Sequence, residues 1–130
     1  MDTLTRVRAI CARFPETQES TLQDRPLFHV RRRRFAILNH LELPYRKRWA
    51  SSGNSLHFAT DKKFLETLST TRFSVSPHHG FRGWRAVSIS EETDWTEIAY
   101  ILESAFKAVA AKEIVKEMEQ ASADDASGSG

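Results

Sequence analysis

Side chains that could do chemistry are concentrated in residues 72–95, which hold two histidines, two glycines, two tryptophans and three arginines. The adjacent His78 and His79 suggest a metal site. Neighbouring residues of an extended strand point to opposite sides, however, so both rings could reach one ion only in a bent turn. No cysteine or third histidine lies close by, and Glu91 and Glu92 belong to the next loop. We expect neither a metal nor a cofactor here, and leave contact with a phosphate or base as the alternative to a surface role.

Two glycines, Gly80 and Gly83, flank Phe81 and Arg82 in the same segment. Their simplest interpretation is a tight turn that needs a positive φ angle. The functional interpretation is a wing that presents Phe81, Arg82 and Arg85 to a ligand. The spacing does not make a phosphate loop, because the Lys-Ser/Thr pair of that motif is missing.

A run of four arginines, Arg31–Arg34, separates two strand-like segments and predicts a hairpin with a basic tip, although it lacks the glycine or asparagine of a good two-residue turn. A second basic segment, Tyr45–Trp49, reads Y-R-K-R-W, and Trp49 would suit stacking on a base. Clustered guanidinium groups bind phosphates and gain from counterion release, whereas the alternative is a tip that is merely solvated. The predicted nucleic-acid-binding residues are Arg31, Arg32, Arg33, Arg34, Arg46, Lys47, Arg48, Trp49, Arg82 and Arg85.

Enzymatic motifs are missing from the sequence, which has no G-x-S-x-G, no H-E-x-x-H and no nucleotide fingerprint. His29, His40 and His57 each lie in a predicted strand beside apolar neighbours, where a half-buried, hydrogen-bonded histidine is more common than a catalytic base. We therefore predict a protein without catalytic residues. An enzyme would need a cleft that joins His78 or His79 to a carboxylate.

Composition indicates one globular domain: of 130 residues, 40% are hydrophobic and 28% charged. No apolar run reaches the roughly 18 residues of a membrane span, and the first residues do not resemble a signal peptide. The single cysteine, Cys11, suits a small buried side chain in a reducing compartment. We expect a cytoplasmic monomer that does not contact membranes.

Charge is distributed unevenly along the chain. Residues 1–90 hold 16 Lys and Arg against 7 Asp and Glu, whereas residues 91–130 hold 3 against 10. The excess in the first part is mostly arginine, the residue that recognises phosphate and carboxylate groups bidentately. This asymmetry predicts an anionic partner, although charged faces are commonly just solvated.

Hydrophobic spacing predicts a helix over Thr3–Phe14, ended by Pro15, and a long helix capped by Thr93 or Asp94 that carries one broad apolar stripe. Ala110–Gln120 continues or restarts that helix. Trp84 and Trp95 are expected in the core. Short strands are predicted near Ser20–Leu22, Phe28–Val30, Phe35–Leu41, Leu56–Ala59, Phe73–Ser76 and Trp84–Ile89.

This order of elements predicts an α+β fold, an antiparallel meandering sheet with the N- and C-terminal helices packed on one face. Residues 1–120 form the single domain. Residues 121–130, rich in alanine, serine and glycine, are expected to be a disordered tail.

Over about residues 4–112 the chain resembles the MmcQ/YjbR family of small bacterial proteins. The resemblance is carried by Phe14–Thr21 (F-P-E-T-Q-E-S-T), Arg25–Ala36 (R-P-L-F-H-V-R-R-R-R-F-A), Phe73–Ile89 with P-H-H-G-F-R-G-W at its centre, and Asp94–Ile98 followed by Ala105–Ala110. The last two segments are fairly specific in combination, whereas the first two are weak alone.

The resemblance implies the CyaY-like fold of frataxin and a proposed double-wing DNA-binding role. One wing would be the hairpin at Arg31–Arg34, and the other the turn at 78–83 with Arg85. Many relatives have a glycine and a lysine in the first hairpin, so four arginines keep its charge but leave its turn type open. Frataxins hold iron on an acidic first helix. Here that helix is basic, which disfavours an iron chaperone; its arginines are Arg6, Arg8 and Arg13.

The leading hypothesis is a non-enzymatic DNA-binding domain that contacts phosphates through basic hairpin wings. Phosphate contacts alone confer affinity without sequence preference, so we expect weak, salt-dependent binding. The alternative is a module that binds an acidic protein or a small anionic molecule, in a biosynthetic or resistance pathway.

Overall fold

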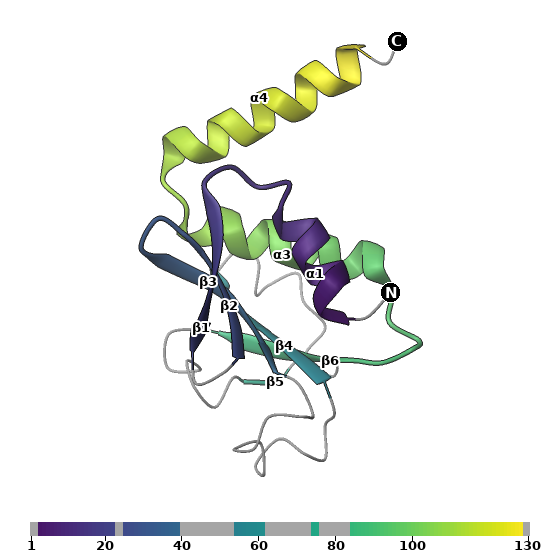
Figure 1. Cartoon of the computed structure of the whole chain (residues 1–130). Coiled ribbons are helices and arrows are strands. Elements are labelled where there is room, and N and C mark those ends of the chain that lie inside the picture. Colours follow the sequence, from purple (N-terminus) through teal and green to yellow (C-terminus); the bar gives the residue numbers. More distant parts are fainter. Residues whose placement is uncertain (1–2, 23–24, 40–53, 62–73, 76–83, 129–130) are drawn as a thin grey trace.

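The computed structural model describes residues 3–22, 25–39, 54–61, 74–75 and 84–128 (Figure 1). Helices stand at both ends of the chain and strands lie between them. The elements are α1 (Thr3–Cys11), β1 (Thr17–Leu22), β2 (Arg25–Val30), β3 (Arg33–Asn39), β4 (Asn54–Phe58), β5 (Ser74–Val75), β6 (Arg85–Ile89), α3 (Trp95–Val109) and α4 (Lys112–Gly128).

The described strands form one antiparallel sheet in the order β1-β2-β3-β4-β6-β5. The α+β class predicted from the sequence is confirmed. The first four strands form the expected meander, but the last two depart from it. β6 pairs with β4, and β5 lies outside it at the edge. A pattern of short apolar segments contains no information about which of two successive strands takes the inner position.

The core lies between the sheet and the helices α1 and α3, which run side by side over one face (Figure 1). Three phenylalanine rings mark its centre: Phe14 follows α1, Phe35 is in β3 and Phe106 is in α3. Their centroids are 5.0 Å apart for Phe14 and Phe106, 5.8 Å for Phe35 and Phe106, and 6.1 Å for Phe14 and Phe35. Such ring pairs contribute about 0.5–1.5 kcal/mol each beyond the area they bury.

Helix α3 begins where the sequence indicates. The Asp94 side chain accepts a hydrogen bond of 3.0 Å from the Thr96 backbone N–H, so Asp94 is the N-cap rather than Thr93. The apolar stripe of α3 faces the core, as expected. The helix ends at Val109, and the extended backbone of its C-cap, Ala110, separates α3 from α4. The segment predicted over Ala110–Gln120 therefore restarts a helix, at Lys112, rather than continuing the first one.

Helix α4 is fastened to the domain by its first turns. Ile114 and Met118, four residues apart, are buried in the core, and Lys107 Nζ of α3 lies 3.6 Å from Glu119 Oε1. The far end of α4 projects away from the body of the domain (Figure 1). The sequence indicated a disordered tail from residue 121, whereas the structure continues α4 to Gly128. The alanines in this segment favour the helix.

Among the described residues, no helix combines the length and the apolar character that crossing a bilayer requires.

Candidate nucleic-acid interface

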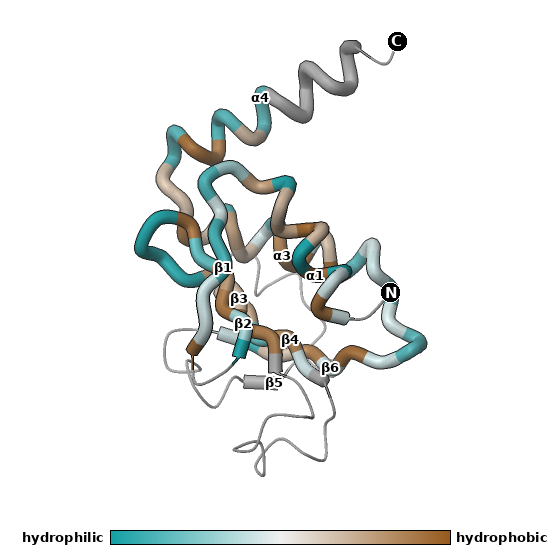
Figure 2. Tube along the Cα trace, viewed as in Figure 1, coloured by the Kyte–Doolittle hydropathy of each residue, from teal (hydrophilic) through white to brown (hydrophobic). Residues whose placement is uncertain are grey.

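The four arginines divide between a turn and a strand. Val30 pairs with Arg33, so only Arg31 and Arg32 form the turn between β2 and β3. The sequence pattern placed all four arginines at the tip, but Arg33 and Arg34 belong to β3. Figure 2 shows this turn as a hydrophilic stretch beside the hydrophobic centre of the sheet.

Arg31 takes the backbone conformation that a two-residue turn usually assigns to glycine or asparagine. Its φ angle is 54°, in the left-handed region, which is unfavourable for a residue with a Cβ atom. The sequence left the turn type open. In the structure, an arginine occupies the left-handed position of the turn. Contacts around the Arg31 side chain and carbonyl stabilise this conformation.

Two carboxylates hold the Arg31 side chain. Its Nε and Nη2 atoms donate to Glu16 Oε1 and Oε2 at 3.1 and 3.2 Å, and its Nη1 donates to Glu113 Oε1 of α4 at 3.3 Å. The hydrogen bond to Glu16, followed by the charge of Glu16 and the bond to Glu113, raises the pKa of Arg31. Arg31 therefore acts as an anchor that joins the hairpin to the start of β1 and to α4.

His29 fixes the backbone of the same turn. Its Nδ1 lies 2.8 Å from the Arg31 carbonyl oxygen, which can only accept, so Nδ1 carries a proton and donates. In the neutral ring Nε2 then accepts from the Ser20 hydroxyl of β1, 2.8 Å away. The prediction of a half-buried, hydrogen-bonded histidine is confirmed for His29. His57 is fully buried, with its Nε2 3.1 Å from Ser55 Oγ.

The next three arginines remain available for other partners. Arg32, Arg33 and Arg34 are all exposed, and within the described parts of the chain they form no ion pair or hydrogen bond through their side chains. Arg33 and Arg34 are neighbours in an extended strand, so their side chains leave opposite faces of the hairpin. Together with Arg32 in the turn, they form an exposed run of three cations.

Arg85 begins β6 at the same end of the sheet as the β2–β3 turn. It pairs with Phe58, which pairs with Ala36, so it lies two strands from β3, about 10 Å at 4.8 Å per strand. The turn projects about four residues beyond this row, roughly 13 Å at 3.3 Å per residue. Arg85 is half-buried, and its Nη1 donates to the Trp84 carbonyl oxygen at 3.1 Å. Arg85 and the hairpin arginines therefore share one end of the sheet without forming one cluster.

The remaining predicted site residues lie outside the described residues. So do His40, the histidine pair His78 and His79, and the turn glycines Gly80 and Gly83. The site residues concerned are Arg46, Lys47, Arg48, Trp49 and Arg82.

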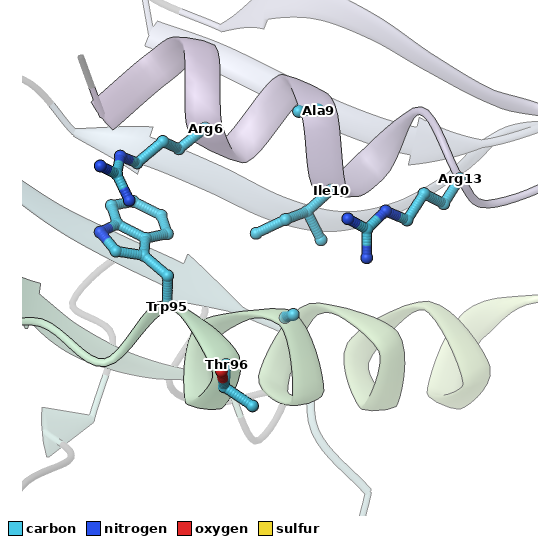
Figure 3. Close-up of a pocket in the computed structure, with 7 residues that line it drawn as sticks. Arg6, Ala9, Ile10, Arg13, Trp95 and Thr96 are labelled. Carbon is cyan, nitrogen blue, oxygen red and sulfur yellow. The ribbon is translucent and has the colours of Figure 1, made fainter. Parts of the chain in front are cut away.

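A groove between α1 and α3 is the feature that the sequence interpretation missed (Figure 3). It has a volume of about 360 Å³. The guanidinium carbon of Arg6 lies 5.2 Å from the ring centroid of Trp95, within the range of a cation–π contact. Trp84 is buried as expected, but Trp95 is only half-buried and lines this groove. The lining residues are Arg6, Ala9, Ile10, Arg13, Trp95, Thr96 and Ala99.

The described titratable residues do not form a metal or thiol site. In that part of the chain, no group of three or more His, Cys, Asp or Glu side chains is close enough to hold an ion. Cys11 is buried with 2% of its surface exposed, as predicted. Burial, and secondarily the charge of Glu19, raise the pKa of the Cys11 thiol. The thiol is thus a core side chain and not an activated nucleophile.

The fold defines an α+β protein that has a counterpart among known structures. The crystal structure of the Deinococcus radiodurans protein DR2400, which carries the domain DUF419, superposes with a TM-score of 0.63. The match covers 92% of this chain and 89% of that chain at 17% sequence identity. No known family model matches the chain, and no curated protein sequence does either. The chain therefore shares the fold of a DUF419 protein.

Proposed function

We propose that this protein binds DNA without strong sequence preference, through phosphate contacts made by the β2–β3 hairpin. The observation that carries the proposal is the state of Arg32, Arg33 and Arg34. They are exposed, consecutive and without a carboxylate partner among the described residues. Arg31, in contrast, is already held by two carboxylates and contributes rigidity.

The shape of the hairpin supports this mode of contact. β1 accompanies β2 as far as Val30, so only the two-residue turn protrudes from the sheet edge, where it can lie against the phosphates of a duplex. Because Arg33 and Arg34 leave opposite faces of the sheet, they can reach phosphates on either side of Arg32. Phosphate contacts of this kind position a protein on DNA without reading the base sequence of the DNA.

As part of the same proposal, we assign the chain to the MmcQ/YjbR family. The four segments that resemble the family support the assignment, together with a fold shared over 92% of the chain with a DUF419 protein. In the double-wing scheme the hairpin would be one wing, and residues 78–83 with Arg85 the other. We place its action in the cytoplasm as a monomer, where a single buried cysteine suits a reducing environment.

Salt dependence of duplex binding tests the proposal. Three phosphate contacts predict that log K falls with log salt concentration with a slope of about −2.7. Fluorescence anisotropy of a labelled duplex of about 20 base pairs, titrated between about 25 and 200 mM NaCl, measures this slope. Binding that ignores salt, or no binding at the lowest salt concentration, would overturn the proposal.

A further inference from the structure

The groove between α1 and α3 is a second candidate site, distinct from the hairpin. Its hollow beside Trp95 has a volume of about 360 Å³, within the range of small-molecule sites. A second hollow of about 350 Å³ continues it toward α4. The two hollows share Ile10, Arg13 and Ala99, so they adjoin each other.

The chemistry of the first hollow favours an anion. Arg6 of α1 and Arg13, which follows α1, lie on either side of Ile10, and among the described residues no acidic side chain lines this hollow (Figure 3). Arg13 is exposed and has no ion pair or side-chain hydrogen bond within the described residues. A guanidinium group in this state can bind a carboxylate bidentately. The second hollow differs, because Glu103 is among the described residues that line it.

The floor of the groove favours an anion that also carries a flat apolar group. Ala9, Ile10 and Ala99 supply small aliphatic surfaces, and the half-buried indole of Trp95 forms one wall. Arg6 lies over the indole and helps to hold its orientation before any ligand arrives. Small-molecule sites have this composition, mostly apolar with a few placed polar groups.

We propose that the α1–α3 groove binds a small aromatic carboxylate, whose ring lies against Trp95 and Ile10 and whose carboxylate pairs with Arg13. The site is separate from the β2–β3 hairpin, so it stands whether or not the protein binds DNA. A ligand with a ring but no charge would keep the apolar contacts and lose the ion pair with Arg13.

Naphthalene-2-carboxylate is a suitable probe, and naphthalene-2-carboxamide is its neutral match. For a ligand of this size, a Kd on the order of 1 mM is expected. Titration of the full ¹⁵N-labelled chain, followed by NMR, should give saturable shifts in residues 6–13 and 95–99. The Trp95 side-chain N–H, assigned with Trp95→Phe, should move with them.

Variants of exposed residues decide the outcome. Arg13→Gln should weaken carboxylate binding by about two- to fivefold, the upper range of an exposed ion pair, and Arg13→Lys should recover part of it. Lys116→Gln, which removes one charge from α4, is the matched control and should leave the Kd unchanged. The carboxamide should bind more weakly than the carboxylate by a similar factor. Shifts that do not saturate or are spread over the domain, or equal binding by the carboxamide or by Arg13→Gln, would overturn the proposal.

Discussion

Glu16 and Arg31 both have left-handed backbones, with φ angles of 56° and 54°, and their side chains are joined by hydrogen bonds of 3.1 and 3.2 Å. They are the non-glycine residues with positive φ in the described part of the chain. One precedes β1 and the other opens the β2–β3 turn, so a single ion pair links two unfavourable bends. Because Arg31 forms this ion pair, its role differs from that of Arg32, Arg33 and Arg34.

Replacement of Arg31 separates its backbone effect from its side-chain effect. Arg31→Ala loses both carboxylate contacts and keeps a Cβ atom in the left-handed region, whereas Arg31→Gly loses the contacts and relieves the backbone. We expect the glycine variant to be the more stable of the two, by about a factor of five or more in the unfolding equilibrium constant. Urea denaturation measures the free energy of unfolding of both variants. Equal stability, or a less stable glycine variant, would show that the turn is not strained.

Cys11 should make stability depend on pH in the alkaline range. Its pKa is raised by burial in the folded protein, whereas in the unfolded chain it stays at about 8.5. The stabilising effect of the buried neutral thiol is thus complete below pH 8.5 and is lost as pH rises, by at most about 1.4 kcal/mol per pH unit. Denaturation curves from pH 7.5 to 10 measure this loss. Cys11→Ala should lack this component of the slope, and parallel curves for the two proteins would contradict the prediction.

The phenylalanine cluster should account for a large share of the stability. Phe106→Ala removes a ring that contacts both Phe14 and Phe35 in a fully buried position, and should cost about 3–5 kcal/mol in the free energy of unfolding. Tyr100→Ala, at a side chain that is 55% exposed on the same helix, should cost about 1 kcal/mol or less. Chemical denaturation compares them. Similar costs for the two would place the core elsewhere.

The N-cap of α3 offers a smaller and more local test. Asp94→Ala removes the acceptor for the Thr96 N–H and should cost about 1 kcal/mol, whereas Asp94→Ser retains an acceptor and should cost clearly less. Thermal unfolding monitored by circular dichroism measures the difference. If the serine variant is no more stable than the alanine variant, the capping bond does not contribute.

Local signals in the sequence explain which parts of the fold could be predicted. The cap at Asp94, the apolar stripe of α3 and the burial of Cys11 depend on residues within one or two helical turns. The order of β5 and β6 depends on contacts across the sheet, which local patterns do not contain. For the same reason the turn residues of the hairpin could not be assigned.

The sequence predicted the cluster of arginines in the candidate site, but it did not predict that the four arginines have different roles. Arg31 differs from Arg32–Arg34 because it meets Glu16, 15 residues away, and Glu113, 82 residues away. Rules based on the spacing of residues along the chain cannot predict contacts over such long sequence separations. The groove beside α1 could have been predicted, since Arg6, Ile10 and Arg13 have the i, i+4, i+7 spacing of one face of the helix predicted over Thr3–Phe14.

Duplex binding by a hairpin variant tests the central proposal most directly. Arg33→Gln/Arg34→Gln removes two hairpin charges, and Lys107→Gln/Lys116→Gln removes two charges from exposed lysines of α3 and α4. The lysine control gives up only a surface ion pair between Lys107 and Glu119, which should affect stability little.

By fluorescence anisotropy at about 50 mM NaCl, the hairpin variant should lose about tenfold or more in affinity, and its salt slope should become about 1.8 units shallower. The lysine variant should bind like the unmodified protein. Equal losses in both variants would mean that DNA responds to net charge alone, and would contradict a role for the β2–β3 hairpin.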